Sequence, residues 1–367
     1  MKWTIIETTS SLKEAYEEHR NAEQVAIDTE FRRRDTFFPH VALMQICWGE
    51  HAYLVDPLKL DDSALLRRLL SETDQLKLIH SASEDLEVFF HWLGVLPTPL
   101  FDTQRAAAIL GLGSGIGYRN LVQRFCEIEL PKAETQSDWM RRPLSSAQIE
   151  YAVQDVSYLY PIGLRLIALA REHQRFEWII EDSAGIFPGA KSLTNKFKTA
   201  YRLSPLKRRV LVGLLEWRDL RAKTLDRPRS WIISDKLIMT LAKNMPQTER
   251  GLLDIDGLSR GMVRRLGREI IHTIASALSL DDKVQTIYLP TPLSGEQKQT
   301  RSLISQFVAK RAEDLNIPPE LLMSKGDVET FIRHIHDRTI EIPTSWSGWR
   351  EEAVIEPLKV FMNTWHL

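Results

Sequence analysis

The first half of the chain alternates short apolar runs with segments in which apolar residues recur every three or four positions. Runs rich in branched residues are typical of strands, and the three-to-four spacing is typical of amphipathic helices. The strands we expect span residues 4–6, 24–28, 42–48, 52–55 and 76–80. The helices we expect span residues 11–20, 62–70, 83–93, 103–110, 118–125 and 146–170. A hairpin at Gly49-Glu50, followed by alternating helices and strands, predicts an α/β domain over residues 1–182, a mixed sheet flanked by helices.

Helical periodicity dominates the second half of the chain, where no run fits a strand. Residues 183–203 are rich in Gly, Pro, Lys and Thr, which predicts a linker. Residues 221–228 return ninety positions later as residues 311–318, with Arg-Ala, Leu and Pro at identical offsets. We therefore expect two copies of one small all-α domain, over residues 204–285 and 290–367.

The composition is that of an ordinary globular protein, with 43% hydrophobic and 26% charged residues. A length of 367 residues exceeds what one hydrophobic core usually serves, so two or three domains are expected. The longest apolar run, at 162–170, is interrupted by Arg165, and the N-terminus lacks the apolar core of a signal peptide, so we expect no membrane segment. Cys47 and Cys126 lack metal-ligand or redox spacing, which favours free thiols in a reducing compartment, the cytoplasm.

The formal net charge of −1 conceals an uneven distribution. Residues 1–190 hold 28 acidic against 19 basic side chains, and residues 191–285 hold 20 basic against 10 acidic ones. A basic middle block beside an acidic first block suggests that one part binds a polyanion while the other collects metal ions. Two solvated surfaces of unlike sign explain the same numbers, and the charge count does not separate these interpretations.

Two carboxylates end the apolar run at residues 25–28, namely Asp28 and Glu30. Side chains on a strand alternate between its two faces, so this pair points to the same side. Neighbouring acids at the end of a buried strand repel each other, and a hard cation such as Mg²⁺, which prefers oxygen ligands, relieves that repulsion. A solvated rim is the commoner explanation of such a pair taken alone.

Asp85 lies in the first turn of the expected helix 83–93, where an acid complements the helix dipole. Ser81 and Glu84 fit a capping box for that helix. Asp102 directly precedes the helix at 103–110 and is interpreted as its N-cap, outside any site.

Tyr151 and Asp155 are four residues apart, on one face of the last expected helix of the domain. A phenol satisfied by a neighbouring acid explains that pair taken alone. Residues 111–117 are rich in glycine but follow a helix rather than a strand, so we expect a flexible connection there and not a phosphate-binding loop.

These four acids and the tyrosine are more informative together, in their order along the chain, than any one of them alone. Asp-x-Glu, a later Asp and a final Tyr-x-x-x-Asp resemble the three motifs of the DEDD exonuclease superfamily, in its tyrosine-bearing branch. The connecting segments resemble the ribonuclease D family within that superfamily. They include Phe38-Pro39, residues 43–46, Asp56-Pro57-Leu58, residues 101–104, Ser137-Asp138-Trp139 with Arg142-Pro143-Leu144, and Gln148 with Tyr151-Ala152. The repeated helical segments resemble the HRDC domains of that family, the first copy more closely than the second.

The resemblance implies a ribonuclease H-like fold for residues 1–182 and a metal-dependent 3′→5′ exoribonuclease. Such an enzyme releases nucleoside 5′-monophosphates and trims the 3′ extensions of tRNA precursors and other structured RNAs. By the same resemblance, two divalent cations, Mg²⁺ or Mn²⁺, are held by four carboxylates, and a tyrosine orients the attacking water. These catalytic residues are Asp28, Glu30, Asp85, Tyr151 and Asp155, and all but the tyrosine are metal ligands. No position of the nuclease motifs departs from the family pattern.

The residues expected to contact RNA are cations and aromatic rings near the catalytic strand and in the basic block. They are Arg32, Arg33, Arg34, Phe37, Phe38, Lys207, Arg208, Arg209, Arg218, Arg221 and Lys223. Cations suit contact with phosphates, and aromatic faces suit stacking with bases. Solvated basic surfaces explain these residues equally well. We expect a monomer that binds RNA without base readout.

Two other functions fit the same residues. The first is a DNA 3′→5′ exonuclease, because the catalytic residues do not select the sugar. The second is a catalytically silent RNA-binding scaffold, which intact acids at all four positions argue against.

Overall fold

The computed structural model describes residues 2–131, 134, 137–186, 193–194, 196–280 and 290–364. The chain divides into two compact units, one made of residues 1–32, 40–188 and 293–367 and the other of residues 33–39 and 189–292. Much of the predicted linker, residues 187–192 and 195, lies outside the described residues, as do residues 281–289 and 365–367 at the ends of the two predicted all-α domains.

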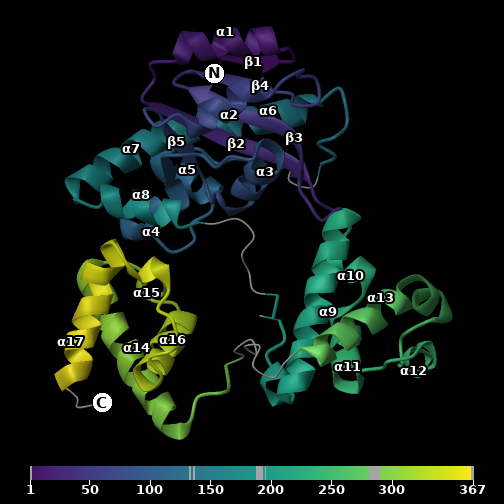
Figure 1. The fold of residues 1–367 in the computed structure, drawn as a ribbon. Helices are drawn as coiled ribbons and strands as arrows, with labels where there is room; N and C mark the ends of the chain where they lie inside the picture. The colour runs from purple at the N-terminus through teal and green to yellow at the C-terminus, as the bar shows by residue number, and fades with distance from the viewer. Residues whose placement is uncertain are drawn as a thin grey trace. The chain divides into compact units, whose positions relative to one another are not determined.

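A six-stranded mixed sheet forms the centre of the first unit, in the order β1-β4-β3-β2-β5-β6 (Figure 1). Its strands are β1 Lys2–Ile6, β2 Gln24–Arg32, β3 His40–Trp48, β4 His51–Val55, β5 Leu76–Ile79 and β6 Leu100–Asp102. Strand β2 pairs antiparallel with β3 and parallel with β5. The prediction of a mixed sheet is confirmed, with the hairpin at Gly49-Glu50 joining β3 to β4. The prediction missed β6, because three residues are too few to show a period.

Helices cover both faces of the sheet. In this unit they are α1 Thr9–His19, α2 Ala64–Ser71, α3 Ser83–Leu93, α4 Thr103–Ile109, α5 Tyr118–Cys126, α6 Ser146–Ser157, α7 Leu159–Glu172 and α8 Phe176–Ala184. Strand alternation separates two cores: Ala26 packs with α6 and α7, whereas Val25 and Ile27 pack with α1, α2 and α3. The same alternation directs successive side chains of β2 to opposite sides as the strand approaches its end.

The single helix expected at 146–170 is wrong, because the chain forms α6 and α7 with a break at Tyr158. Pro161 explains the break. Proline has no backbone N–H to donate, and its ring clashes with the carbonyl four residues earlier, which belongs to Ser157. Helix α6 ends at that residue.

The Asp102 carboxylate accepts hydrogen bonds at the start of α4 and in the two residues that precede α3. It accepts from the backbone N–H groups of Gln104 (2.8 Å) and Arg105 (3.2 Å), which confirms Asp102 as the N-cap of α4. It also accepts from the N–H groups of Ser81 (3.2 Å) and Ala82 (2.9 Å). The capping box predicted for α3 is therefore wrong, because a carboxylate from the neighbouring strand end takes its place.

Arg142 links the loop before α6 to the sheet. Its guanidinium donates to both carboxylate oxygens of Asp56, at 2.6 and 2.9 Å, and to the backbone carbonyls of Ala42 (2.6 Å) and Trp139 (2.7 Å). The Asp56 side chain is 3% exposed. The two segments that carry the family resemblance at residues 56–58 and 137–144 are thus in direct contact.

Replacing Arg142 with Met is expected to destabilise the protein by roughly 3–5 kcal/mol, because it leaves the carboxylate of Asp56 buried without a cation. Urea unfolding of the variant measures the change. Arg141→Met, at the exposed neighbouring position, is the control and should unfold like the parent protein. A midpoint for Arg142→Met equal to that of the control would contradict the assignment.

The C-terminal helices of the first unit pack against α8 and the loop after α4. They are α14 Gly295–Leu315, α15 Pro319–Leu322, α16 Lys325–His336 and α17 Glu356–Thr364. The rings of Trp178 and Trp349 stack at a centroid distance of 5.1 Å, and Arg350 pairs with Asp182. Such contacts give these helices a packing role in the first unit.

The glycine-rich segment 111–117 is one of the surfaces that these helices contact. Gly111 has φ +73°, and a Cβ there would lie 2.4 Å from Nδ2 of Asn316. Ser114 donates a hydrogen bond of 2.7 Å to Glu320. The flexible connection predicted at 111–117 is therefore held at two points, and at Gly111 only glycine permits the close approach.

The second unit is helical. Its helices are α9 Pro205–Thr224, α10 Arg229–Ile232, α11 Asp235–Asn244, α12 Glu249–Leu253 and α13 Arg260–Ser279. The repeat has a structural counterpart: α10 and α15 begin ninety positions apart, and Ser234 and Ser324 each cap the helix that follows.

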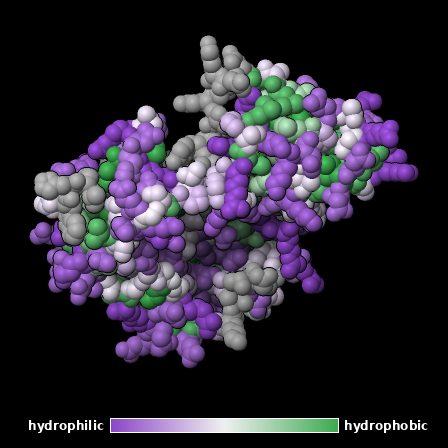
Figure 2. Space-filling model, turned by 90° about the horizontal axis from the view of Figure 1, so that it is seen from below, coloured by the Kyte–Doolittle hydropathy of each residue, from purple (hydrophilic) through white to green (hydrophobic). Residues whose placement is uncertain are grey.

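Hydrophilic side chains predominate on the face that Figure 2 shows, and hydrophobic ones occur there in small separate groups, as is ordinary for a protein surface. Among the helices that the structure describes, none combines the length and the apolar character needed to cross a membrane.

Candidate active site

Three carboxylates from two elements converge beside the end of β2. Asp28 and Glu30 come from that strand and Asp155 from α6, and one oxygen of each lies within 4.8 Å of the others. Asp28 pairs with Gln45 of β3, and the register shifts immediately after Glu30. Only residues 24–26 of β2 pair with β5, so Asp28 and Glu30 lie beyond the part of β2 that this neighbouring strand covers.

Asp85, the fourth predicted acid, comes from the first turn of α3 and is buried. Thr29 lies between the two acids of β2, and its hydroxyl donates a hydrogen bond of 2.5 Å to Asp85. Alternation along β2 thus directs Asp28 and Glu30 to one side and Thr29 to the side of α3. Asp85 is not a member of the 4.8 Å group, but its charge acts on Asp28.

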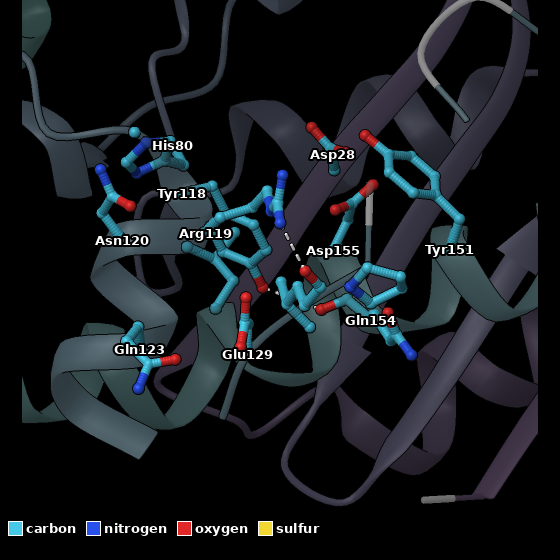
Figure 3. Close-up of a pocket in the computed structure, with 14 residues that line it drawn as sticks. Asp28, His80, Tyr118, Arg119, Asn120, Gln123, Glu129, Tyr151, Gln154 and Asp155 are labelled. Carbon is cyan, nitrogen blue, oxygen red and sulfur yellow. Dashed lines mark hydrogen bonds between the residues drawn. The ribbon is translucent and has the colours of Figure 1, made fainter. Parts of the chain in front are cut away.

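Tyr151 and Asp155 lie one turn apart on α6, and burial and this carboxylate are among the causes that raise the pKa of the phenol. The helix begins with a capping box formed by Ser145 and Gln148, which fixes the start of the helix one turn before Tyr151. Figure 3 shows the Tyr151 hydroxyl and the carboxylates of Asp28 and Asp155 pointing toward one another. The sequence spacing therefore places the phenol at the carboxylate cluster.

Burial and mutual repulsion raise the pKa values of these carboxyl groups. Burial is the largest cause throughout: it raises the pKa of Glu30 to about 9, of Asp155 to about 8 and of Asp85 to about 7. For Asp28, burial followed by the charges of Asp85, Asp155 and Glu30 raises the pKa well above its ordinary value. Burial and the neighbouring carboxylates also raise the pKa of Tyr151, so the phenol stays protonated. The fold thus disfavours the negatively charged form of these carboxyl groups.

The donor set fits divalent metal ions. Its ligand atoms are carboxylate oxygens, which Mg²⁺ and Mn²⁺ prefer. Oδ2 of Asp155 is buried and has no hydrogen-bond partner in the described part of the chain. A buried carboxylate oxygen without a donor is costly, and a bound cation satisfies it. The predicted metal site is thus chemically consistent with the oxygens that the fold brings together.

A pocket of about 770 Å³ opens beside the cluster, and Asp28, Tyr151 and Asp155 line one side of it (Figure 3). The other side comes largely from α5 and the segment after it. The residues there that the sequence prediction did not include are His80, Tyr118, Arg119, Asn120, Gln123, Glu129 and Gln154. His80 stands five residues before Asp85 in a segment that carries the family resemblance. The residues of α5 gave no sequence signal, because only the packing of that helix places them at the site, whereas Gln154 is the neighbour of Asp155 on α6.

The predicted RNA contacts at residues 32–38 divide into two groups. Arg32, Arg33 and Arg34 are exposed, as a phosphate contact requires. Phe37 is buried in the core of the second unit, under the guanidinium of Arg229 at 4.6 Å. This arrangement favours a packing role for Phe37 over the predicted stacking with bases.

Phe38 and the backbone of this segment are also held within the second unit. Oδ1 of Asp226 accepts hydrogen bonds from the N–H groups of Phe37 (2.9 Å) and Phe38 (3.0 Å). The Phe38 ring packs partly buried against the same core and edge-on against Phe37. The segment after the catalytic strand therefore serves as a packed part of the helical unit.

The basic side chains of α9 differ in how far they are available to contact an RNA phosphate. Arg218 is 5% exposed and donates to Asp235 (2.7 Å) and to the Ile233 carbonyl (3.0 Å), so a structural role replaces the predicted phosphate contact. Arg221 pairs with Glu269, and Lys223 pairs with Asp219. These two pairs would compete with a phosphate.

The three cations at the start of α9 are half-buried. Arg208 donates to the Leu203 carbonyl (2.9 Å) and Arg209 to the Leu280 carbonyl (2.9 Å). Lys207 lies one turn into the helix, after the cap formed by Ser204. The carbonyl that Arg208 contacts carries no formal negative charge, so this bond does not exclude a phosphate contact. Lys207, Arg208 and Arg209 stay candidates for phosphate contacts.

Comparison with known proteins gives consistent matches. Residues 3–168 match the 3′-5′ exonuclease family, and residues 207–274 match the HRDC domain. The chain is 35% identical over 360 residues to ribonuclease D of Pseudomonas paraeruginosa, with 96% of each chain covered. It is 38% identical over 348 residues to ribonuclease D of Xanthomonas oryzae pv. oryzae, with 91% of this chain and 93% of the relative covered. The crystal structure of Escherichia coli RNase D, an exoribonuclease involved in structured RNA processing, superposes with a TM-score of 0.90 at 28% identity, covering 99% of both chains.

Proposed function

The chain belongs to the ribonuclease D family of 3′-5′ exoribonucleases, and from that premise we propose how its residues act and on which RNAs. The predicted family is confirmed, and so is the match of the first all-α region to an HRDC domain. We propose that the enzyme releases nucleoside 5′-monophosphates and trims the 3′ extensions of tRNA precursors and other structured RNAs. The relation to a protein involved in structured RNA processing supports that substrate class.

Asp28, Glu30, Asp85 and Asp155 would hold two divalent cations, Mg²⁺ or Mn²⁺. When bound, such ions lower the pKa of an attacking water and offset the charge on the reacting phosphate and the leaving 3′ oxygen. Asp28, Glu30 and Asp155 have the required proximity. Asp85 is oriented by the Thr29 hydroxyl.

Tyr151 orients the attacking water. Its phenol stays neutral, so it can donate one hydrogen bond and accept another at the edge of the carboxylate cluster. The hydroxyl points toward the carboxylates of Asp28 and Asp155 (Figure 3). Orienting a water requires the phenol to be correctly placed and does not require it to lose its proton. This fits Tyr151, because burial has raised its pKa.

The domain division that we propose is an exonuclease domain at 1–182, a linker at 183–203, a first HRDC domain at 204–285 and a second, divergent HRDC domain at 290–367. The basic first HRDC domain would add nonspecific phosphate contacts, and the repeat supports the identity of the second. We propose a monomer. The free thiols of Cys47 and Cys126 suit the reducing cytoplasm.

The observation that carries the proposal is the convergence of Asp28, Glu30 and Asp155 beside the Tyr151 hydroxyl in a chain of this family. The test is incubation with a 3′-extended tRNA, with and without chelator, resolving the products nucleotide by nucleotide. Shortening in single-nucleotide steps that stops with EDTA and returns with Mg²⁺ or Mn²⁺ is the expected result. Trimming that continues in excess chelator would refute the metal assignment.

Matched RNA and DNA oligonucleotides tested in the same assay separate the expected activity from a DNA exonuclease. Faster digestion of RNA is expected. RNA binding without any shortening would instead indicate the scaffold function.

A further inference from the structure

The side of the pocket opposite the catalytic tyrosine is the outer face of α5. Leu121 and Val122 are fully buried and fix this helix to the core. Helical spacing then turns Arg119, Asn120 and Gln123 outward, and all three line the pocket. The wall is polar and anchored, which suits a surface that receives part of a charged substrate.

Arg119 carries the only positive charge among the fourteen residues that line the pocket, which also include Asp28, Asp155 and Glu129. Figure 3 shows its guanidinium inside the pocket, between the side chains of Tyr118 and Asp155. An RNA strand that enters an otherwise acidic pocket brings negative phosphates, and a fixed cation reduces the repulsion.

The guanidinium of Arg119 is positioned without being neutralised. One Nη2–H group donates a 2.7 Å hydrogen bond to the backbone carbonyl of Leu130, which is itself buried. Among the described residues, no carboxylate oxygen lies within 4.0 Å of the Arg119 guanidinium, so none forms an ion pair with it. A guanidinium has five N–H donors, so four remain for a ligand in a fixed orientation.

We propose that Arg119 binds an RNA phosphate upstream of the scissile bond. The inference rests on the proposed function, because it takes the carboxylate cluster as the place of the scissile phosphate. Tyr151, Asp28 and Asp155 mark that place on one side of the pocket, and Arg119 projects from the other. A cation in the cluster itself would compete with the divalent ions for the same carboxylates, whereas the next phosphate along the strand has no such ligand.

A contact of this kind positions the strand rather than performing chemistry. It makes affinity depend on whether the substrate has a second phosphate, and it contributes to the salt dependence. Each neutralised phosphate of a single strand adds about 0.7 to the slope of log affinity against log salt.

The test compares Arg119→Gln with Arg124→Gln on two substrates. Arg124 is the matched control: it is an exposed arginine of the same helix, donates to a backbone carbonyl (Leu112, 2.8 Å) and does not line the pocket. One substrate is a short RNA oligonucleotide. The other is the p-nitrophenyl ester of uridine 5′-monophosphate, which has a cleavable phosphodiester and no upstream phosphate.

Arg119→Gln is expected to raise KM for the oligonucleotide roughly tenfold and to reduce the salt slope by about 0.7, while its hydrolysis of the ester stays at the parent rate. Arg119→Lys should recover part of the loss, and Arg124→Gln should behave like the parent on both substrates. Equal losses on the two substrates, or no loss on the oligonucleotide, would overturn the proposal. The parent protein's own metal-dependent shortening of RNA, measured alongside, shows separately whether the proposed function holds.

Discussion

Replacing Tyr151 with Phe is expected to lower turnover by roughly 10²–10⁴-fold while leaving metal affinity nearly unchanged. The substitution removes one oxygen from a ring that packs near Trp139, with ring centroids 5.9 Å apart, so the fold has no reason to change. It leaves the carboxylate of Asp155 in place, so the set of proposed metal ligands is unchanged. The function that we propose for the hydroxyl, and that the variant would lose, is the orientation of the water in the chemical step.

Single-turnover hydrolysis of a labelled RNA measures the chemical step directly, and metal titration followed by thermal unfolding measures the affinity. Tyr160→Phe is a suitable control, because that phenol lies in the neighbouring helix and does not line the pocket. A full single-turnover rate in Tyr151→Phe would show that the hydroxyl does not orient the water.

Replacing Asp28 with Asn is expected to reduce activity at least about 100-fold and, at the same time, to stabilise the metal-free protein. Activity falls because the substitution removes one of the proposed ligands of the metal. Stability rises because the native state holds Asp28 in a buried cluster where its charge is repelled by Asp85, Asp155 and Glu30. The protein thus gives up stability at its active site, as enzymes commonly do.

The sign of the pH dependence follows from the raised pKa values. Each of these carboxyl groups releases its proton at higher pH in the native than in the unfolded state, for example at about 9 for Glu30 and about 8 for Asp155. The native state therefore holds more protons across this interval, and the metal-free protein loses stability as the pH rises from about 5 to 9. Mg²⁺ should restore more stability at pH 9 than at pH 6, because the ligands must be deprotonated.

Thermal unfolding in EDTA at a series of pH values measures both effects. Asp28→Asn should raise Tm by a few degrees at pH 8, at about 2–4 °C per kcal/mol, and by little at pH 5. Glu14→Gln, which removes one exposed charge from α1, should leave Tm unchanged. A metal-free Asp28→Asn protein that melts at or below the parent temperature at pH 8 would contradict the repulsive arrangement.

The sequence alone determined the elements that carry the site. The period of two along β2 placed Asp28 and Glu30 on one side, and the period of α6 placed Tyr151 one turn from Asp155, because both relations depend only on local backbone geometry. The order of the motifs then led to the family, since the spacing of chemically specific residues survives where most of the sequence differs. Local signals also gave the cap at Asp102 and would have given the helix break at Pro161.

Only the tertiary structure decided which residues are available and what surrounds the carboxylates. Arg218 and Phe37 have the composition of an RNA-binding surface, but packing buries them, and burial depends on neighbours distant in sequence. Arg119 gave no signal, because its place in the pocket comes from the packing of α5 on the core. The raised pKa values likewise need burial and neighbouring acids, and both are set by the sheet and two helices together.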